Sequence, residues 1–381
     1  MPNRRDFLRG VAGAAGGALL LGKDGLVKNV YGLPQPQADA GAAAVAPGKR
    51  REIKVGGRRV KTVDAHCHVN VPEVRDLLKG TPLERAGGGG AAAGGPEGML
   101  LGPNRIALMD QEGIDVEAVS INAFWYGADR DLAEKLIDLQ NQKLAAMCAQ
   151  NPDRFVGFTS VALQFPDLAA QQMEDGIKKY GLRGAAIGGS VNGEELSDPK
   201  YDPFWAKAEE LQGLVFMHPQ DSARATGITD RAKGNGVLAN VIGNPLETTF
   251  FLSHLIMEGT LDKFPNLKLM AAHGGGYLPS YVDRLDHGCL TFPQQCKVTL
   301  KKKPSEYMHM LYVDSLVFSP EALRHLVAVC GASQIGIGTD YPFPWTTTPC
   351  DHILETPVSN ADKIAMLGGN MCKLLNIPVT T

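Results

Sequence analysis

The sequence of 381 residues predicts an α/β fold, a (β/α)8 TIM barrel with loop insertions at its catalytic face. Short apolar runs typical of buried strands alternate with helical patterns eight times along the chain. Four of these runs end on histidine or aspartate, as expected where parallel strands finish at a common face. The length leaves room for a barrel of about 250 residues together with its insertions.

The alternation of strands and helices begins at Thr62. We expect strands at residues 62–66, 116–121, 155–161, 183–187, 214–218, 267–272, 311–314 and 335–339. Helical patterns occupy residues 104–112, 130–149, 167–180, 201–211, 245–258, 277–288, 319–330 and 359–376. Insertions are expected at 81–98, a Gly- and Ala-rich loop, and at 219–243 and 289–309, over the catalytic face.

The N-terminal 40 residues resemble a twin-arginine-type signal peptide. The pair Arg4-Arg5 precedes Phe-Leu and then the weakly apolar segment Gly10–Gly22, which is shorter than the roughly 20 residues of a membrane span. Cleavage near Ala40 would leave a mature chain without a membrane span, exported to the periplasm; a tail without a targeting function is the alternative. Residues 41–60 are predicted to be a linker with a hairpin at 53–60, and residues 61–381 the barrel.

Composition excludes several classes of protein. A net charge of −3 gives no electrostatic argument for binding nucleic acid. Seven cysteines without a C-x-x-C pair argue against a disulfide framework and a zinc ribbon, although Cys289 and Cys296 can pair if oxidised. Serine-triad, P-loop and dinucleotide-binding motifs are absent from the sequence.

The strand ends predict a metal centre. His66 and His68 end the first strand, His218 the fifth and Asp340 the eighth. Side chains alternate along a strand, so the two histidines of His-x-His face the same side and can bind one ion. Three imidazoles and one carboxylate suit Zn²⁺, and equally Mn²⁺ or Fe²⁺.

His273 ends the sixth strand and is followed by three glycines. Because it lies one strand from His218, we expect it to be the acid/base group that handles the proton of water activated by the ion. A single histidine at a strand end is as often structural as functional. Five such groups on four strand ends favour the metal site.

The run from Thr62 to Ile377 resembles the amidohydrolase-related family of the metal-dependent hydrolase superfamily, and within it the branch of α-amino-β-carboxymuconate-ε-semialdehyde decarboxylase. The resemblance rests on the order of these motifs: Asp64-Ala-His66-Cys-His68, Arg105-Ile-Ala-Leu-Met-Asp110, Arg154-Phe-Val-Gly157, Phe216-Met-His218-Pro219, Gly243-Asn-Pro-Leu-Glu-Thr248, Phe264-Pro-Asn-Leu-Lys268, His273-Gly-Gly-Gly276 with Arg284, and Gly338-Thr-Asp340-Tyr-Pro-Phe343.

The resemblance implies a barrel, one divalent ion and nonoxidative loss of CO2. Its matched positions make His66, His68, His218 and Asp340 metal ligands, and His273 the acid/base. His-x-His, in place of the Glu-x-His of the resorcylate-type branch, favours zinc, whereas Gln220 replaces a tryptophan that the resemblance leads us to expect.

Two arginines extend the resemblance to the substrate and to a partner subunit. Arg105 resembles an arginine that holds a substrate carboxylate. Arg284 resembles one that reaches into the partner's site, which implies a homodimer. Structural salt bridges are the alternative for both.

The sequence is consistent with three functions. The first is a metal-dependent decarboxylase, a carboxy-lyase, acting on a small unsaturated or aromatic carboxylic acid. The second is a metal-dependent hydrolase of a lactone or amide, which would not need both arginines. The third is a binding protein with a vestigial site, and the retention of all five polar groups argues against it.

Overall fold

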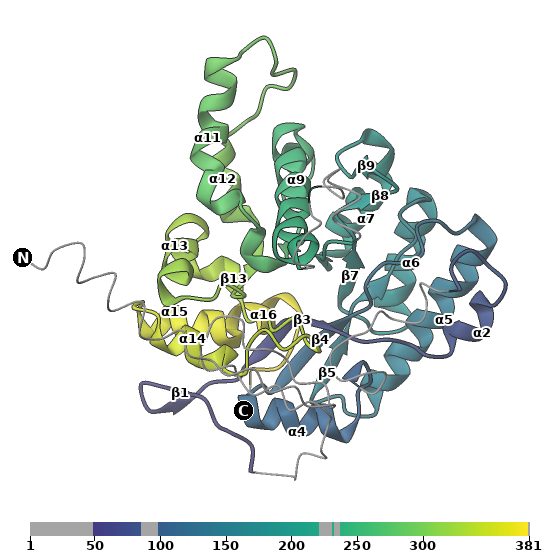
Figure 1. Ribbon diagram of the computed structural model, residues 1–381, viewed down its shortest axis with the longest axis vertical. Coiled ribbons are helices and arrows are strands. Elements are labelled where there is room, and N and C mark those ends of the chain that lie inside the picture. Colours follow the sequence, from purple (N-terminus) through teal and green to yellow (C-terminus); the bar gives the residue numbers. More distant parts are fainter. Residues whose placement is uncertain (1–48, 85–97, 221–230, 232–236, 380–381) are drawn as a thin grey trace, which may run out of the picture. The chain divides into compact units, whose positions relative to one another are not determined.

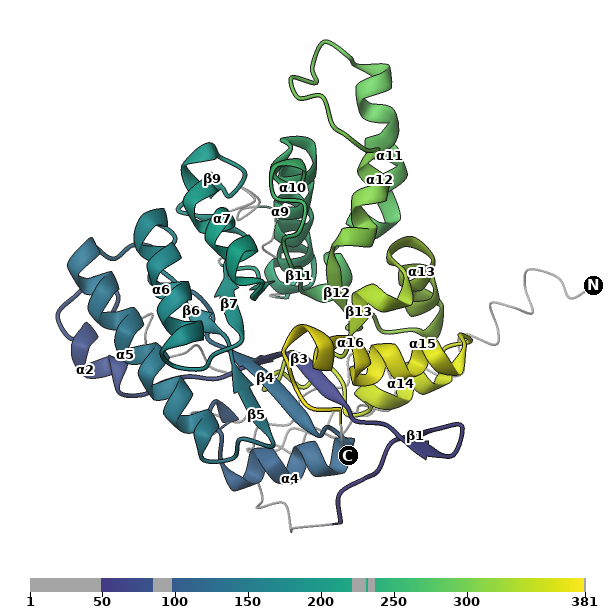
Figure 2. The same ribbon diagram turned by 180° about the vertical axis from the view of Figure 1, so that it is seen from behind.

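The computed structural model describes residues 49–84, 98–220, 231 and 237–379. The predicted signal peptide and its cleavage site lie outside these residues. Eight parallel barrel strands run through the described chain, the third of them in two parts (Figures 1 and 2). They are β3 (Val63–His68), β4 (Val116–Ser120), β5 (Phe155–Gly157) with β6 (Thr159–Ser160), β7 (Gly184–Ile187), β10 (Leu214–Met217), β11 (Leu269–Ala271), β12 (Tyr312–Asp314) and β13 (Ile335–Gly336).

The strands close into a barrel. β3, β4 and β5 pair in that order, and β6, β7, β10, β11, β12 and β13 follow one another in a second run. The two runs join at Phe158, whose backbone N–H donates to the Val119 carbonyl, and at bridges from Asp64 to Ile337 and from Cys67 to Tyr341. Every predicted strand is present and the predicted fold class is confirmed.

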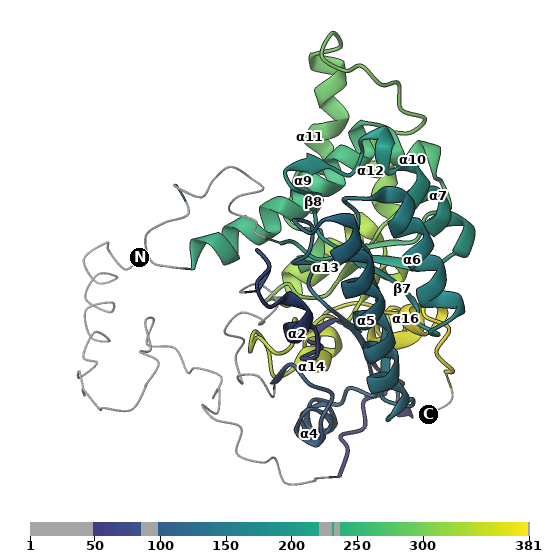
Figure 3. The ribbon, with the colours of Figure 1, turned by 90° about the vertical axis from the view of Figure 1, so that its right-hand side faces the viewer.

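Helices surround the strands, and α5, α6 and α7 lie side by side on the outside (Figures 2 and 3). The predicted helices are α4 (Pro103–Glu112), α5 (Arg130–Ala149), α6 (Pro166–Lys178), α7 (Asp202–Leu211), α9 (Asn244–Met257), α11 (Leu278–Thr291) and α13 (Pro320–Cys330), and the last divides into α15 (Asn360–Ile364) and α16 (Asn370–Leu374). Local caps fix several boundaries: Asp129 accepts from Leu132 N at the start of α5, and Gly113 ends α4 with φ 78°. No helix in the described part is long and apolar enough to cross a membrane.

The hairpin predicted at 53–60 is present, with β1 (Lys54–Val55) and β2 (Arg58–Arg59) joined by two glycines of positive φ. The sequence did not indicate α2 (Val74–Leu78), β8 (Ser190–Val191), β9 (Glu194–Glu195), α10 (Thr260–Lys263), α12 (Pro304–Tyr307) or α14 (Pro349–Glu355). These pieces are too short for periodicity to reveal them.

The predicted insertions differ in how the structure describes them. Most of 81–98 and of 219–243 lies outside the described residues, apart from a π-helix at Ala239–Gly243 that leads into α9. The insertion at 289–309 projects beyond the end of α11 (Figure 1) and contains a Cys289–Cys296 disulfide with a Cα–Cα distance of 5.6 Å. This insertion comes at the end of helix α11, whereas the insertion at 219–243 comes directly after strand β10.

Side chains inside the barrel pack against the C-terminal ends of the strands. Small residues such as Ala65 and Ala118 leave room for Phe158 and Phe216, whose stacked rings lie 5.7 Å apart. The ring of Phe216 also lies 5.2 Å from that of His66. Close packing of this kind restricts the His66 ring to one orientation.

Candidate metal centre

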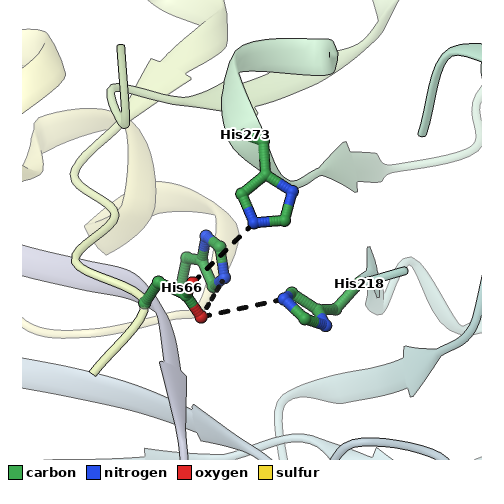
Figure 4. A group of neighbouring side chains, drawn as sticks. His66, His218 and His273 are labelled. Atoms are coloured by element: carbon green, nitrogen blue, oxygen red, sulfur yellow. Dashed lines mark ion pairs between the residues drawn. The ribbon is translucent and has the colours of Figure 1, made fainter. Parts of the chain in front are cut away.

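Four imidazoles meet one carboxylate at the C-terminal ends of the strands. Asp340 Oδ1 lies 2.9 Å from His68 Nε2, 3.2 Å from His66 Nε2 and 3.7 Å from His218 Nε2. Asp340 Oδ2 lies 3.8 Å from His273 Nε2. Figure 4 shows His66, His218 and His273 converging from separate elements. All five residues singled out in the sequence are therefore brought together.

Backbone geometry holds two of these groups in unusual positions. His273 and Asp340 have φ values of 57° and 59°, in the left-handed region that residues with a side chain seldom adopt. Each such conformation costs on the order of 1–3 kcal/mol, and such strain concentrates at functional sites. The loop after His273 needs its glycines, because a Cβ at Gly276 would lie 2.2 Å from the Pro245 carbonyl oxygen.

Asp314, at the end of β12, holds the His66 ring and the backbone of His273 by hydrogen bonds. Its Oδ2 accepts from His66 Nδ1 at 2.7 Å and from the backbone N–H of His273 at 2.7 Å. Its Oδ1 accepts from the backbone N–H groups of Gly274 and Leu316, each at 2.9 Å. The contact to His66 turns the Nε2 atom of that ring toward Asp340. Asp314 therefore orients His66.

Burial and charge set the protonation of the site when only protein groups are considered. Burial opposes ionisation of Asp340, but the charge of His66 outweighs it and holds the carboxyl pKa well below its usual range. Burial likewise opposes a charge on His66, and Asp340 together with Asp314 outweighs it and raises the pKa to about 10. Burial lowers the pKa of His68 and of His218, so these two rings stay neutral.

These residues fit a divalent cation. His218 Nε2 is buried without a hydrogen-bond partner in the described chain, as expected of a nitrogen that needs a ligand. Donor atoms of His66, His218, His273 and Asp340 all lie within 4.8 Å of one another. That group contains His273 instead of His68, although His68 is the imidazole nearest to Asp340. The division into ligands and acid/base therefore stays a prediction.

The two arginines are placed differently from each other. Arg105 is buried behind His68, where Nε donates to Glu117 Oε2 and Nη1 to the His68 carbonyl, both at 2.6 Å. Its guanidinium also lies over the Tyr341 ring, 4.3 Å from the centroid. This placement matches the alternative of a structural ion pair, and a contact with substrate stays a prediction. Arg284 is exposed on α11, and its reach toward a partner stays a prediction.

Two further residues complete the site. Trp345 Nε1 donates to Asp340 Oδ2 at 2.8 Å, and Ser120 Oγ lies 3.0 Å from His68 Nδ1. Sequence reasoning missed both contacts. Ser120 ends β4 beside β3, which was a usable signal, whereas Trp345 reaches Asp340 through a loop whose course no pattern reveals.

A cavity of about 200 Å³ opens beside His273. It is lined by Asn240, Val241, Asn244, Pro245, His273, Gly276, Tyr277, Leu316, Phe318 and Trp345. Aromatic and aliphatic walls with one imidazole at the edge suit a small, flat ligand with a polar end.

A closed barrel with imidazoles and a carboxylate at its strand ends defines a metal-dependent enzyme of the TIM-barrel class. A family model described as Amidohydrolase matches residues 63–377. The chain belongs to this family.

Two curated relatives of this chain are decarboxylases. The 2-amino-3-carboxymuconate-6-semialdehyde decarboxylase of Dictyostelium discoideum is 33% identical over 277 residues, covering 72% of this chain and 76% of that one. A gamma-resorcylate decarboxylase of Polaromonas sp. is 29% identical over 285 residues, covering 72% of this chain and 86% of the relative.

A solved structure that is similar to this chain is also a decarboxylase. The 5-carboxyvanillate decarboxylase from Novosphingobium aromaticivorans, complexed with manganese and 4-hydroxy-3-methoxy-5-nitrobenzoic acid, has a TM-score of 0.75 and 26% identity. The match covers 85% of this chain and 99% of that chain. This manganese-bound relative and the His/Asp cluster support one divalent metal ion in the present site.

Proposed function

We propose that this protein is a metal-dependent nonoxidative decarboxylase of a small unsaturated or aromatic carboxylic acid. The observation that carries the proposal is the convergence of four imidazoles on Asp340 beside an aromatic-lined cavity. The decarboxylase relatives confirm the predicted enzyme class, a carboxy-lyase, and favour it over the hydrolase alternative.

His66, His68, His218 and Asp340 would hold the ion, most simply Zn²⁺, with Mn²⁺ or Fe²⁺ as alternatives. When bound, the ion supplies positive charge that fixes the substrate's carboxylate or an adjacent oxygen and stabilises negative charge in its conjugated system.

His273 handles the proton. When the bond to the carboxylate breaks, its electron pair stays on the substrate carbon, and that carbon takes a proton from His273 as CO2 leaves. The side chain is only 13% exposed, borders the cavity and has its backbone fixed by Asp314. The aromatic wall would hold the ring flat and exclude water from the carbon that is protonated.

The test is CO2 release by the metal-loaded protein from a panel of hydroxybenzoates and muconate-type acids. His273→Asn should lower kcat by about 10²–10⁴-fold while the metal content is unchanged, because the lost group moves a proton. His254→Asn is the matched control, since His254, on α9, pairs with Glu258 and lies outside the His/Asp cluster. Absence of CO2 from the whole panel would contradict the proposal.

We further propose a homodimer in which Arg284 of each subunit serves the site of the other. In support, α11 and the segment after it expose large apolar residues that water does not favour: Tyr281 at 64%, Leu290 at 77% and Phe292 at 56%. Mixing Arg284→Ala and His273→Asn subunits tests this, since a shared site predicts that the mixture recovers activity that neither parent variant has. No recovery in confirmed mixed dimers would refute it.

Export by the twin-arginine pathway remains our proposal for location. The Arg4-Arg5 motif supports it, and so does the Cys289–Cys296 disulfide, a bond typical of oxidising compartments. Replacing both arginines by lysine should abolish periplasmic delivery in a fractionation assay. Unchanged delivery would refute the signal.

A further inference from the structure

Arg105 and Glu117 form a buried ion pair between helix α4 and strand β4. The guanidinium Nε of Arg105 donates to Glu117 Oε2 at 2.6 Å. Burial opposes the charge on Arg105, but the carboxylate of Glu117 outweighs burial and raises the pKa of the guanidinium. Arg105 therefore stays charged inside the protein.

Stability alone does not account for this ion pair. Replacing a buried ion pair by apolar residues is often neutral or stabilising, because burial removes both charges from water. One of the three guanidinium nitrogens of Arg105, Nη2, is buried and has no hydrogen-bond partner in the described chain, which adds to the cost. The other contacts of Arg105 give a better reason for its presence.

Those contacts reach two parts of the metal centre. Arg105 Nη1 donates to the His68 carbonyl at 2.6 Å. The guanidinium carbon lies 4.3 Å from the centre of the ring of Tyr341, the residue directly after Asp340. The backbone N–H of His68 in turn donates to the Tyr341 carbonyl at 2.7 Å. One guanidinium thus contacts both the end of β3 and the segment that carries Asp340.

We propose that Arg105, held by Glu117, is a positioning residue that fixes His68 relative to Asp340. The inference rests on the proposed function, in which both of these groups would hold the metal ion. Asp340 Oδ1 lies 2.9 Å from His68 Nε2, so a shift of either backbone segment changes the set of donor atoms directly. Donors that are fixed in advance favour binding, because less order has to be created when the ion arrives.

The test measures metal binding by the full chain, freed of metal, in Arg105→Met, Glu117→Gln and a control, Arg154→Met. Arg154 is also buried, donates to two backbone carbonyls and pairs with Asp110, but it lies at the opposite end of the barrel, where β4 and β5 begin. Competition with a chromophoric chelator gives the Kd of Zn²⁺. The visible spectrum of the Co²⁺-loaded protein reports the arrangement of the donors.

We expect Arg105→Met to weaken the Kd by about tenfold or more and to change the Co²⁺ spectrum, because His68 and Asp340 lose their common support. Glu117→Gln keeps an oxygen but loses the charge that holds the guanidinium, and should weaken the Kd by more than about threefold. Arg154→Met should lower the thermal midpoint of unfolding and leave both the Kd and the spectrum unchanged.

Circular dichroism shows which variants fold, and Glu117→Gln decides the matter if Arg105→Met does not. A Kd within about threefold of the parent and an unchanged spectrum in both variants overturn the proposal, and so does an equal loss of affinity in Arg154→Met. A rise in KM for CO2 release with an unchanged Kd would place Arg105 at the substrate, which also overturns it. Both metal measurements are made without substrate, so their outcome does not depend on whether the protein is a decarboxylase.

Discussion

Replacing Asp314 by asparagine tests whether the hydrogen bonds that Asp314 accepts position the metal centre. The carboxylate is fully buried and accepts four hydrogen bonds, two on each oxygen. An amide keeps only one oxygen, so the two donors opposite its NH2 lose their acceptor. Hydrogen bonds to a charged group contribute about 1.5–3 kcal/mol each, so the loss of two costs about 3 kcal/mol of stability or more. Loss of the partner of a metal-binding histidine weakens metal affinity by about 10–100-fold.

The assay pairs competition with a chromophoric chelator, which gives the metal Kd, with urea denaturation, which gives stability. Asp115→Asn is the control, because Asp115 is also buried and hydrogen-bonded to backbone, but at the opposite end of the barrel. The control should lose stability and keep its metal affinity. Metal affinity of Asp314→Asn within about threefold of the parent would refute the reasoning, since a role limited to folding leaves the Kd unchanged.

Three other predictions concern the site and the insertion after α11. The pKa of His66 is raised to about 10, so metal binding at pH 8 should release about one proton from this ring, and the release should fade as the pH rises through 10. Calorimetry in buffers of different ionisation enthalpy measures the number of protons released. No release at pH 8 would contradict the assignment of His66 as a metal ligand. Trp345→Phe removes the hydrogen bond to Asp340 and keeps an aromatic wall, so kcat/KM should fall by about tenfold in steady-state assays; an unchanged value would show that the contact is dispensable. The oxidised chain, unfolded without reductant, should present five thiols to a chromogenic reagent and seven after reduction; seven in both cases would exclude the Cys289–Cys296 bond.

The barrel could be predicted from the sequence because each strand is marked by the pattern of its own few residues. Each apolar run carries its own signal, and the rule that parallel strands finish at one face then places His66, His218 and Asp340 together. Asp314, which orients His66, also ends a strand, β12. Site residues at strand ends can thus be predicted from the sequence alone.

Side chains that act across loops were not predictable in this way. The contact of Trp345 with Asp340 depends on the path of the loop after β13 and on a rotamer, neither of which has a periodic signature. The burial of Arg105 depends on Glu117, a charged residue in the middle of β4 that a pattern of apolar runs does not single out.

The most direct test of the central claim is the titration of metal-free protein with Zn²⁺ or Mn²⁺ while CO2 release is measured. If the three imidazoles and Asp340 form one catalytic site, CO2 formation should rise in proportion to added metal and saturate at about one ion per chain. CO2 formation that persists in metal-free protein would contradict the account.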